Sequence, residues 1–205
     1  MKFKEFQKIP RLNRDVIITE KLDGTNGQIC IHDLSDIDKV DLDPEMIEFI
    51  KLYCLYQRDT LYLFAGSRNR WLTLKDDNYG FARWVTNNAD ELLKLGEGFH
   101  YGEWWGNGIQ RGYGATEKRF SLFNVHKWSD DVVRPKCCSV VPKLYEGLFD
   151  TSMVDKILND LKEHGSYAIP FMNPEGIIIF HKPSGYMFKK TILNDQQPKG
   201  QSNDN

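Results

Sequence analysis

The alternation of apolar and polar positions predicts a chain built mainly of short strands. Residues 16–20 form a β-branched run and residues 28–32 alternate, so the polar turn between them predicts a hairpin-like unit. Further strands are predicted at residues 61–65, 98–105, 119–128, 175–181 and 186–190. The last two strands flank the turn 182–185 and close the predicted fold.

Apolar residues at helical spacing predict three helices in the same chain. These helices cover residues 44–56, residue 81 to near Gly96, and residues 151–164. In the third helix, Ser152 and Asp155 resemble a capping box at the start, and Gly165 is the predicted C-cap. Residues 33–44 and 130–142 are predicted loops, and residues 196–205 are predicted to form a polar, disordered tail.

The predicted elements indicate one domain of the α+β class. No internal repeat divides the chain, and no linker separates two cores. We therefore expect residues 1–195 to form a single domain of mostly antiparallel sheets flanked by helices.

Composition narrows the possible functions. The chain has 205 residues and a net charge of −2, which argues against a histone-like coating protein. Any nucleic-acid site must then be a local basic patch or use bound metal. The four cysteines lack C-x-x-C spacing, so we expect free thiols in a reducing compartment. The chain has no apolar signal segment and no membrane-length apolar run, which predicts a cytoplasmic protein with no membrane partner.

The first candidate for chemistry is the stretch EKLDGTNG at residues 20–27, where a lysine leaves a strand and meets a glycine-bearing turn. Lys21 can attack phosphorus only as a neutral amine, a state favoured by burial, neighbouring cations or bound metal. Gly24 and Gly27 would let the backbone approach a ligand closely. Taken alone, the pattern better fits an ordinary β-turn with an exposed lysine.

Three later signals add to this pattern. Glu103 lies in an aromatic strand beside glycines, where a carboxylate could accept hydrogen bonds from ribose hydroxyls. Glu175 stands at the entrance of an apolar strand, and Lys189 with Lys190 stands near the end of another. Each alone reads as an ordinary strand, turn or surface residue. In this fixed order, however, the lysine, the two glutamates and the lysine pair are the set expected for covalent nucleotidyl transfer.

The combined pattern resembles the ATP-dependent RNA ligases, especially the repair-type phage enzymes of the covalent nucleotidyltransferase superfamily. The matching segments are residues 20–26 (first motif), 65–69 (arginine segment), 101–103 (third motif), 120–125 (adenine-packing strand), 175–176 (fourth motif) and 188–190 (fifth motif). The resemblance spans residues 9–199. It implies an ATP-grasp-like ligase adenylation domain without the OB-fold that DNA ligases and capping enzymes carry.

The resemblance also implies a role for each matching residue. Lys21 would be the nucleophile, Glu103 and Glu175 catalytic carboxylates that bind metal, and Lys189 a catalytic phosphate contact. The implied nucleotide-binding residues are Glu20, Asp23, Gly24, Asn26, Arg68, Phe123, Lys189 and Lys190. Phe123 would stack on adenine, and Glu20 would contact the adenine edge through its backbone and neighbouring groups. The choice between Lys189 and Lys190 stays open, because the family's K-x-K spacing finds only one lysine here.

Four cations are candidate contacts to nucleic acid: Arg68, Arg70, Arg111 and Lys118. Arg111 lies in the glycine-rich stretch 108–114. That stretch reads either as a mobile clamp on a strand or as a plain surface loop.

The implied reaction joins RNA 5′-phosphate and 3′-hydroxyl ends through a lysyl-AMP and a 5′-adenylylated intermediate. ATP and Mg²⁺ or Mn²⁺ are the implied cofactors, and RNA is the implied partner, in RNA repair. An RNA–DNA hybrid or a nicked duplex stays open as the substrate, as does the oligomeric state. The alternatives are a 5′-adenylating or DNA-directed ligase, a capping-type guanylyltransferase and a non-catalytic nucleic-acid-binding relative.

Overall fold

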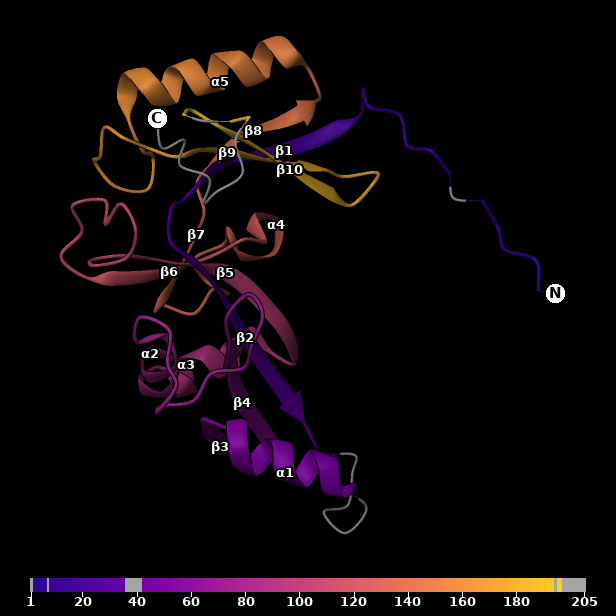
Figure 1. The fold of residues 1–205 in the computed structure, drawn as a ribbon, viewed down its shortest axis with the longest axis vertical. Helices are drawn as coiled ribbons and strands as arrows, with labels where there is room; N and C mark the ends of the chain where they lie inside the picture. The colour runs from indigo at the N-terminus through magenta and orange to yellow at the C-terminus, as the bar shows by residue number, and fades with distance from the viewer. Residues whose placement is uncertain (1, 7, 36–41, 194, 197–205) are drawn as a thin grey trace, which may run out of the picture. The chain divides into compact units, whose positions relative to one another are not determined.

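The structure is a computed structural model that describes residues 2–6, 8–35, 42–193 and 195–196. The chain forms two compact units, each with its own sheet (Figure 1). The terminal unit comprises Met1–Leu22 and Pro142–Asn205, and the central unit comprises Asp23–Val141. The predicted α+β class with mostly antiparallel sheets is confirmed. A single ligase domain over residues 1–195 stays a prediction.

The terminal unit is a four-stranded antiparallel sheet in the order β10-β9-β1-β8. Its strands are β1 (Asp15–Lys21), β8 (Lys143–Leu148), β9 (Gly176–His181) and β10 (Tyr186–Thr191). Helix α5 (Thr151–His164) lies along one face of this sheet (Figure 1). Val16 and Ile18 of β1 form a core with α5, because alternate side chains of a strand face the same side.

The start of α5 differs from the predicted capping box. The helix begins at Thr151, and the Oδ1 atom of Asp150 accepts a hydrogen bond from Ser152 N at 2.8 Å. Asp150 is therefore the N-cap, and Ser152 already lies inside the first turn. Gly165 is the C-cap, as predicted, with a positive φ of 83° that favours glycine.

The central unit is a six-stranded sheet in the order β3-β4-β2-β5-β6-β7. Its strands are β2 (Thr25–Asp33), β3 (Tyr56–Arg58), β4 (Leu61–Gly66), β5 (Gly98–Gly106), β6 (Lys118–Leu122) and β7 (Cys138–Val140). All pairs are antiparallel except β6 with β7. Its main core includes Ile29, Leu63, Trp104 and Phe120, which are almost fully buried.

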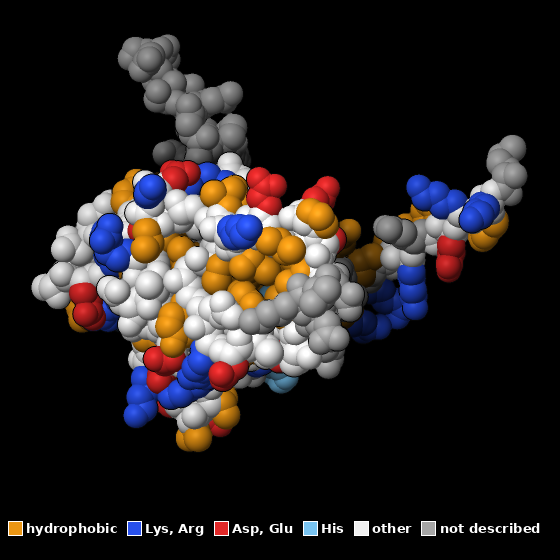
Figure 2. All heavy atoms as spheres, turned by 90° about the horizontal axis from the view of Figure 1, so that it is seen from below, with side chains coloured by type: hydrophobic (Ala, Val, Ile, Leu, Met, Phe, Trp, Pro, Cys, Tyr) orange, Lys and Arg blue, Asp and Glu red, His pale blue; other side chains and the backbone are white. Residues whose placement is uncertain are grey.

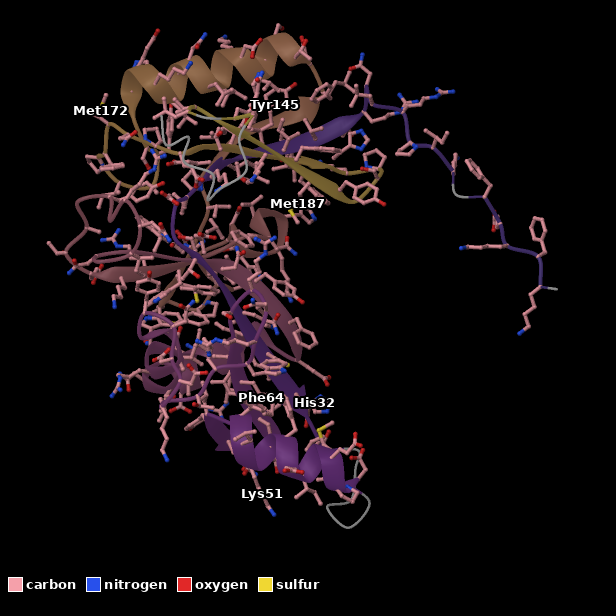
Figure 3. All side chains as sticks on the ribbon, viewed as in Figure 1. His32, Lys51, Phe64, Tyr145, Met172 and Met187 are labelled. Atoms are coloured by element: carbon pink, nitrogen blue, oxygen red, sulfur yellow. The ribbon has the colours of Figure 1, made fainter. Side chains whose placement is uncertain are left out.

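Short helices cover parts of the central sheet. They are α1 (Pro44–Tyr53), α2 (Phe81–Asn87), α3 (Ala89–Leu92), the 3-10 helix η1 (Leu93–Leu95) and α4 (Val125–Trp128). Helix α1 packs through Phe49 against Phe64, whose ring lies 5.2 Å away between centroids (Figure 3). These contacts close a second, smaller core on the face of the sheet opposite the main one.

Several predicted boundaries were wrong. The helix predicted from residue 81 to near Gly96 is broken at Asn88, whose Nδ2 donates to Trp84 O at 2.8 Å and ends α2. The predicted strand 119–128 ends at Leu122, because Asn124 accepts a hydrogen bond from Lys127 N and caps α4. Helix α1 ends at Tyr53 rather than at residue 56.

Three strands, β3, β7 and β8, were not predicted. Strand β7 lies inside the predicted loop 130–142 and pairs with β6 by three residues. Strand β8 carries charged side chains among its apolar ones, so its pattern was weak, and pairing with β1 defines it. Part of the predicted loop 33–44 (residues 36–41) and nearly all of the predicted tail lie outside the described residues.

In the described ranges, no helix combines the length and the apolar character that crossing a membrane requires. A cytoplasmic location stays a prediction. The four cysteines Cys30, Cys54, Cys137 and Cys138 are free, as predicted.

The cap of α5 gives a direct test of this local structure. Asp150→Ala removes the acceptor for the first-turn amide and should destabilise α5 by about 1 kcal/mol, whereas Ser152→Ala should change little. Hydrogen exchange of the α5 amides measures both effects. If the α5 amides exchanged faster in Ser152→Ala than in Asp150→Ala, Ser152 and not Asp150 would be the N-cap.

Candidate functional site

Lys21 and Glu175 form an ion pair at one end of the terminal sheet. Lys21 lies opposite Gly176, the residue after Glu175, in the register of β1 and β9. Its Nζ lies 2.5 Å from Glu175 Oε2, and the two side chains are 18% and 4% exposed. Gly176 has no room for a side chain, because a Cβ there would lie 2.2 Å from Lys190 O. The predicted nucleophile and one predicted carboxylate therefore meet in a largely shielded place.

The two candidate phosphate-binding lysines face opposite sides of this sheet. Lys189 pairs with Ile178 and therefore shares the face of Lys21, whereas Lys190 pairs with Ile177 and faces α5. Lys190 Nζ lies 2.9 Å from Oδ1 of Asp155 on α5. Figure 3 shows these two faces, with Tyr145 between the sheet and α5 and Met187 on the other side. Lys189, and not Lys190, thus shares the sheet face of Lys21, while phosphate binding by either lysine stays a prediction.

Glu20 points away from Lys21, toward the α5 side. Its Oε2 accepts a hydrogen bond from Tyr167 N at 2.8 Å, while Oε1 is buried with no hydrogen-bond partner in the described structure. Burial raises the pKa of the Glu20 carboxyl, and hydrogen bonds from Ser166 and from the backbone of Tyr167 and Ala168 oppose this rise. The side chain therefore anchors the loop after α5. Any contact to adenine would have to come from its backbone or its neighbours.

Glu103 holds the turn that follows Lys21 in sequence. In the central unit, its Oε1 accepts from Gly24 N at 3.0 Å and its Oε2 accepts from Asn26 Nδ2 at 3.1 Å. Asn26 lies directly opposite Glu103 in the β2–β5 pair. Glu103 is only 8% exposed. Its predicted roles in ribose or metal binding stay predictions, and its observed contacts are structural.

Asp23 is held from two directions by the loop after β5. Its backbone N donates to Tyr113 Oη at 2.9 Å, and its Oδ2 accepts from Arg111 Nε at 2.9 Å. Tyr113 is fully buried and packs edge-on against Trp105. The glycine-rich stretch 108–114 is thus fixed to the central unit by Tyr113 and by the buried Ile109. Arg111, a predicted nucleic-acid contact, is engaged with Asp23.

The two glycines of the turn serve close packing within the protein. A Cβ on Gly24 would lie 2.3 Å from Trp104 O and 2.7 Å from Trp105 Cβ. A Cβ on Gly27 would lie 2.7 Å from the ring of Phe81. The sequence interpretation assigned these glycines to close approach of a ligand. In the structure, the backbone at these glycines approaches β5 and the aromatic core. Close approach of a ligand stays a prediction.

Aromatic side chains lie on the same face of β5 as Glu103. Phe99 and Tyr101 are 54% and 52% exposed, and their rings stack at a centroid distance of 6.3 Å. They share the face of Glu103 because all three lie at alternate positions of one strand. Phe123, the predicted adenine-stacking residue, is half-buried, and its N donates to Tyr101 O. This part of the central unit therefore offers flat apolar surfaces beside a carboxylate.

The remaining predicted cations have different surroundings. Arg68 is exposed in the turn after β4 and makes no ion pair with any described residue. Arg70 pairs with Asp76 at 2.7 Å, and Lys118 Nζ donates to Tyr79 O at 2.7 Å. Arg68 is thus the most available of the predicted nucleic-acid contacts.

The Glu175 carboxylate suits a divalent cation such as Mg²⁺, whose remaining ligands are water and substrate phosphates. Among the residues described, no group of three or more His, Cys, Asp or Glu side chains gathers as a metal cluster. Mg²⁺ commonly binds through one or two carboxylates and completes its shell with water and substrate phosphates. Glu175 offers such an oxygen donor beside Lys21, so the donor set fits this kind of metal site.

Sequence reasoning missed the residues that hold the predicted ones in place. Tyr113 binds the Asp23 amide across 90 positions, and Tyr167 binds Glu20 across 147. The sequence signal for Tyr113 was weak, a tyrosine between glycines. Its φ of 53° places it in a backbone region that few side chains adopt, which only the folded loop explains.

A match to a known family shows to which family this chain belongs. The sequence model of the RNA ligase family matches residues 14–191, which include Lys21, Glu103, Glu175 and Lys189. The chain belongs to the RNA ligase family. The sequence resemblance to ATP-dependent RNA ligases is therefore confirmed.

Solved structures agree with this RNA ligase fold. A lysine-to-methionine mutant of Naegleria gruberi RNA ligase with AMP and Mn matches with a TM-score of 0.52 and 17% identity, over 88% of this chain and 50% of that chain. A lysine-to-alanine mutant with ATP and Mn matches with a TM-score of 0.51 and 17% identity, over 87% and 50%. The chain thus spans about half the length of these enzymes. No curated protein sequence matches it.

The turn after Lys21 gives a test of how this member of the RNA ligase family holds its first motif. Gly24→Ala should destabilise the central unit by about 1–3 kcal/mol, because its Cβ would overlap β5. All five tryptophans lie in the central unit, so tryptophan fluorescence during urea unfolding reports on this unit.

Gly66→Ala is the matched control, since its nearest contact would be an ordinary 3.4 Å. It should be neutral or gain up to about 1 kcal/mol from a less flexible unfolded chain. Equal losses of stability in both variants would contradict the close packing of Gly24.

Proposed function

We propose that this RNA ligase family member joins RNA 5′-phosphate and 3′-hydroxyl ends at the expense of ATP, through a covalent lysyl-AMP on Lys21. One observation carries the proposal: Lys21, at the end of β1, meets the buried Glu175 carboxylate and shares a sheet face with Lys189. A nucleophilic amine, an acceptor for its proton and a cation for phosphate oxygens are what nucleotidyl transfer requires.

In the first step, the Lys21 amine attacks the α-phosphorus of ATP. An N–P bond forms, the bond to the bridging oxygen breaks, and pyrophosphate leaves. The amine must give up a proton, and Glu175 Oε2, 2.5 Å from Nζ, is placed to accept it. Lys189 would hold phosphate oxygens and stabilise charge that builds up in the transition state.

In the second step, the 5′-phosphate of RNA displaces Lys21 from the AMP, which gives a 5′-adenylylated end. In the third step, an RNA 3′-hydroxyl attacks the 5′-phosphorus of that end and AMP leaves. All three steps are transfers at phosphorus, so the protein contributes mainly positioning and charge. A divalent ion, Mg²⁺ or Mn²⁺, would supply further neutralisation of phosphate charge when bound.

The nucleotide and the RNA are assigned by the same reasoning. We propose ATP because the family resemblance implies it and because the Naegleria structures contain ATP or AMP with Mn. Phe123 would stack on adenine, with the Glu20 backbone at its edge, and Asp23, Gly24 and Asn26 would shape the adjoining turn held by Glu103. Glu103 itself would bind ribose or metal. Arg68 would contact ribose or the RNA 5′-phosphate, and a role in cytoplasmic RNA repair completes the proposal.

The proposed function makes a nucleotide-specific prediction. Labelled ATP should leave a covalent adduct on the purified protein, and Lys21→Ala should abolish it, because no other side chain replaces the nucleophile. Lys51→Ala, an exposed lysine of α1, is the control and should label normally.

Four results would contradict this proposal. Undiminished labelling of a folded Lys21→Ala protein would remove Lys21 as nucleophile. Labelling by GTP and not by ATP would favour a capping-type guanylyltransferase. RNA binding without any adduct would favour a non-catalytic relative, and ligation of DNA ends alone would favour a DNA-directed ligase.

The two sheet faces predict unequal effects for the two lysines. Lys189→Ala should slow adduct formation by about 10²-fold or more, because it removes a cation aimed at the transition state. Lys190→Ala should stay within about fivefold of the parent, since it loses only an exposed pair with Asp155. Single-turnover rates of adduct formation measure both. Equal losses in both variants would refute the assignment by face.

A further inference from the structure

The N-terminal arm, residues 2–6 and 8–14, differs in charge from the rest of the chain. It holds Lys2, Lys4, Lys8, Arg11 and Arg14, with Glu5 as its one acidic residue. Removing these five of the 27 basic and one of the 29 acidic residues leaves residues 15–205 with 22 and 28, a net charge of −6. The arm is therefore net positive, whereas the rest of the chain is net negative, and a polyanion is attracted to net positive charge.

The arm also has a period of three residues. Apolar side chains stand at Phe3, Phe6, Ile9 and Leu12, and cations immediately precede three of them, at Lys2, Lys8 and Arg11. Pro10 favours an extended backbone for the residue before it, and a polyproline II helix has three residues per turn. In that conformation the cations and the apolar groups would form two adjoining stripes.

The arm's side chains are open to solvent, and its cations form no ion pair within the described part of the chain. Phe3 is 93% and Phe6 84% exposed, and no described residue forms an ion pair with any of the five cations. Figure 2 shows Lys and Arg side chains alternating with hydrophobic ones along this segment. The arm therefore presents cations and apolar side chains next to one another, and both are accessible to a ligand.

The base of the arm is fixed to the terminal unit. Leu12 O lies 3.1 Å from His181 Nε2 of β9, and Arg14 O accepts from Phe149 N at 2.9 Å. The next residue, Asp15, begins β1, the strand that ends at Lys21. The arm is thus joined directly to the strand that carries the proposed nucleophile.

We propose that the N-terminal arm binds the RNA substrate, with its cations on the phosphates and Phe3 and Phe6 stacked on unpaired bases. The inference rests on the proposed function, which makes the substrate an RNA strand. A body with a net charge of −6 repels such a strand, and the arm's cations offset this repulsion. Aromatic groups interleaved with cations are the usual means of holding single strands without regard to sequence.

The test compares two variants of equal net charge in the full chain. The arm variant is Lys2→Gln, Lys4→Gln, Lys8→Gln and Arg11→Gln. The control variant is Lys51→Gln, Lys75→Gln, Lys156→Gln and Lys162→Gln, four exposed lysines without ion pairs to described residues. Fluorescence anisotropy of a labelled 5′-phosphorylated RNA strand gives the binding constant at several salt concentrations.

The arm variant should bind RNA at least about tenfold more weakly than the control variant at low salt. Its slope of log K against log salt should be shallower by about 3, because each phosphate contact on a single strand contributes roughly 0.7. The double variant Phe3→Ala, Phe6→Ala should weaken binding at least about fivefold with the slope unchanged, since stacking is not ionic. Equal RNA binding by the arm and control variants would overturn the proposal. The proposal would also be overturned if the arm variant lost binding to vesicles of anionic lipid but bound RNA as tightly as the control variant.

Adduct formation from ATP without RNA separates this inference from the proposed function. The arm variant should label at the parent rate, because the arm contacts RNA and not the nucleotide. A parent protein that binds RNA through the arm but never labels would refute the ligase proposal and leave the arm's role standing. If the parent protein labels but the arm variant binds RNA as well as the parent does, the role of the arm is refuted and the ligase proposal stands.

Discussion

The register between β1 and β9 is the constraint on which the proposed chemistry depends. It sets Lys21 opposite Gly176 and brings the Lys21 amine to the Glu175 carboxylate, 154 positions away in the sequence. A slip of one residue would turn every side chain of β1 to the other face of the sheet. The burial of Val16 and Ile18 against α5 prevents that slip, because the opposite face cannot bury them against the helix. The hydrophobic core between β1 and α5 thereby fixes the face of the sheet on which Lys21 lies.

The same division into faces separates function from support in the terminal unit. Lys21 and Lys189 share one face, while Glu20 and Lys190 share the other with α5. The neighbouring residues Glu20 and Lys21 therefore have different roles. Glu20 is buried and anchors the loop after α5, at the cost of one unpaired carboxylate oxygen. Within the terminal unit, the carboxylate that the Lys21 amine contacts is that of Glu175, 154 positions away, and not that of its sequence neighbour Glu20.

In the central unit, most of the polar contacts of the first motif are structural. Glu103, Tyr113 and Arg111 bind the backbone or side chains of the turn at residues 23–26. Gly24 lets that turn lie against β5. A rigid turn suits phosphoryl transfer, in which correct positioning lowers the barrier more than any single reactive group. The family match over residues 14–191 includes this turn and the residues that hold it.

The sequence by itself determined the α+β class, most strands, helix α5, the free cysteines and the set of residues around which the site is built. These follow from local periodicity and from an ordered series of short motifs, which need no knowledge of distant contacts. Only the tertiary structure decided that Lys189 rather than Lys190 shares the face of Lys21, that Asn88 breaks a predicted helix, and that β7 and β8 are strands. Each depends on pairing between segments far apart in the chain, which single-sequence patterns do not contain.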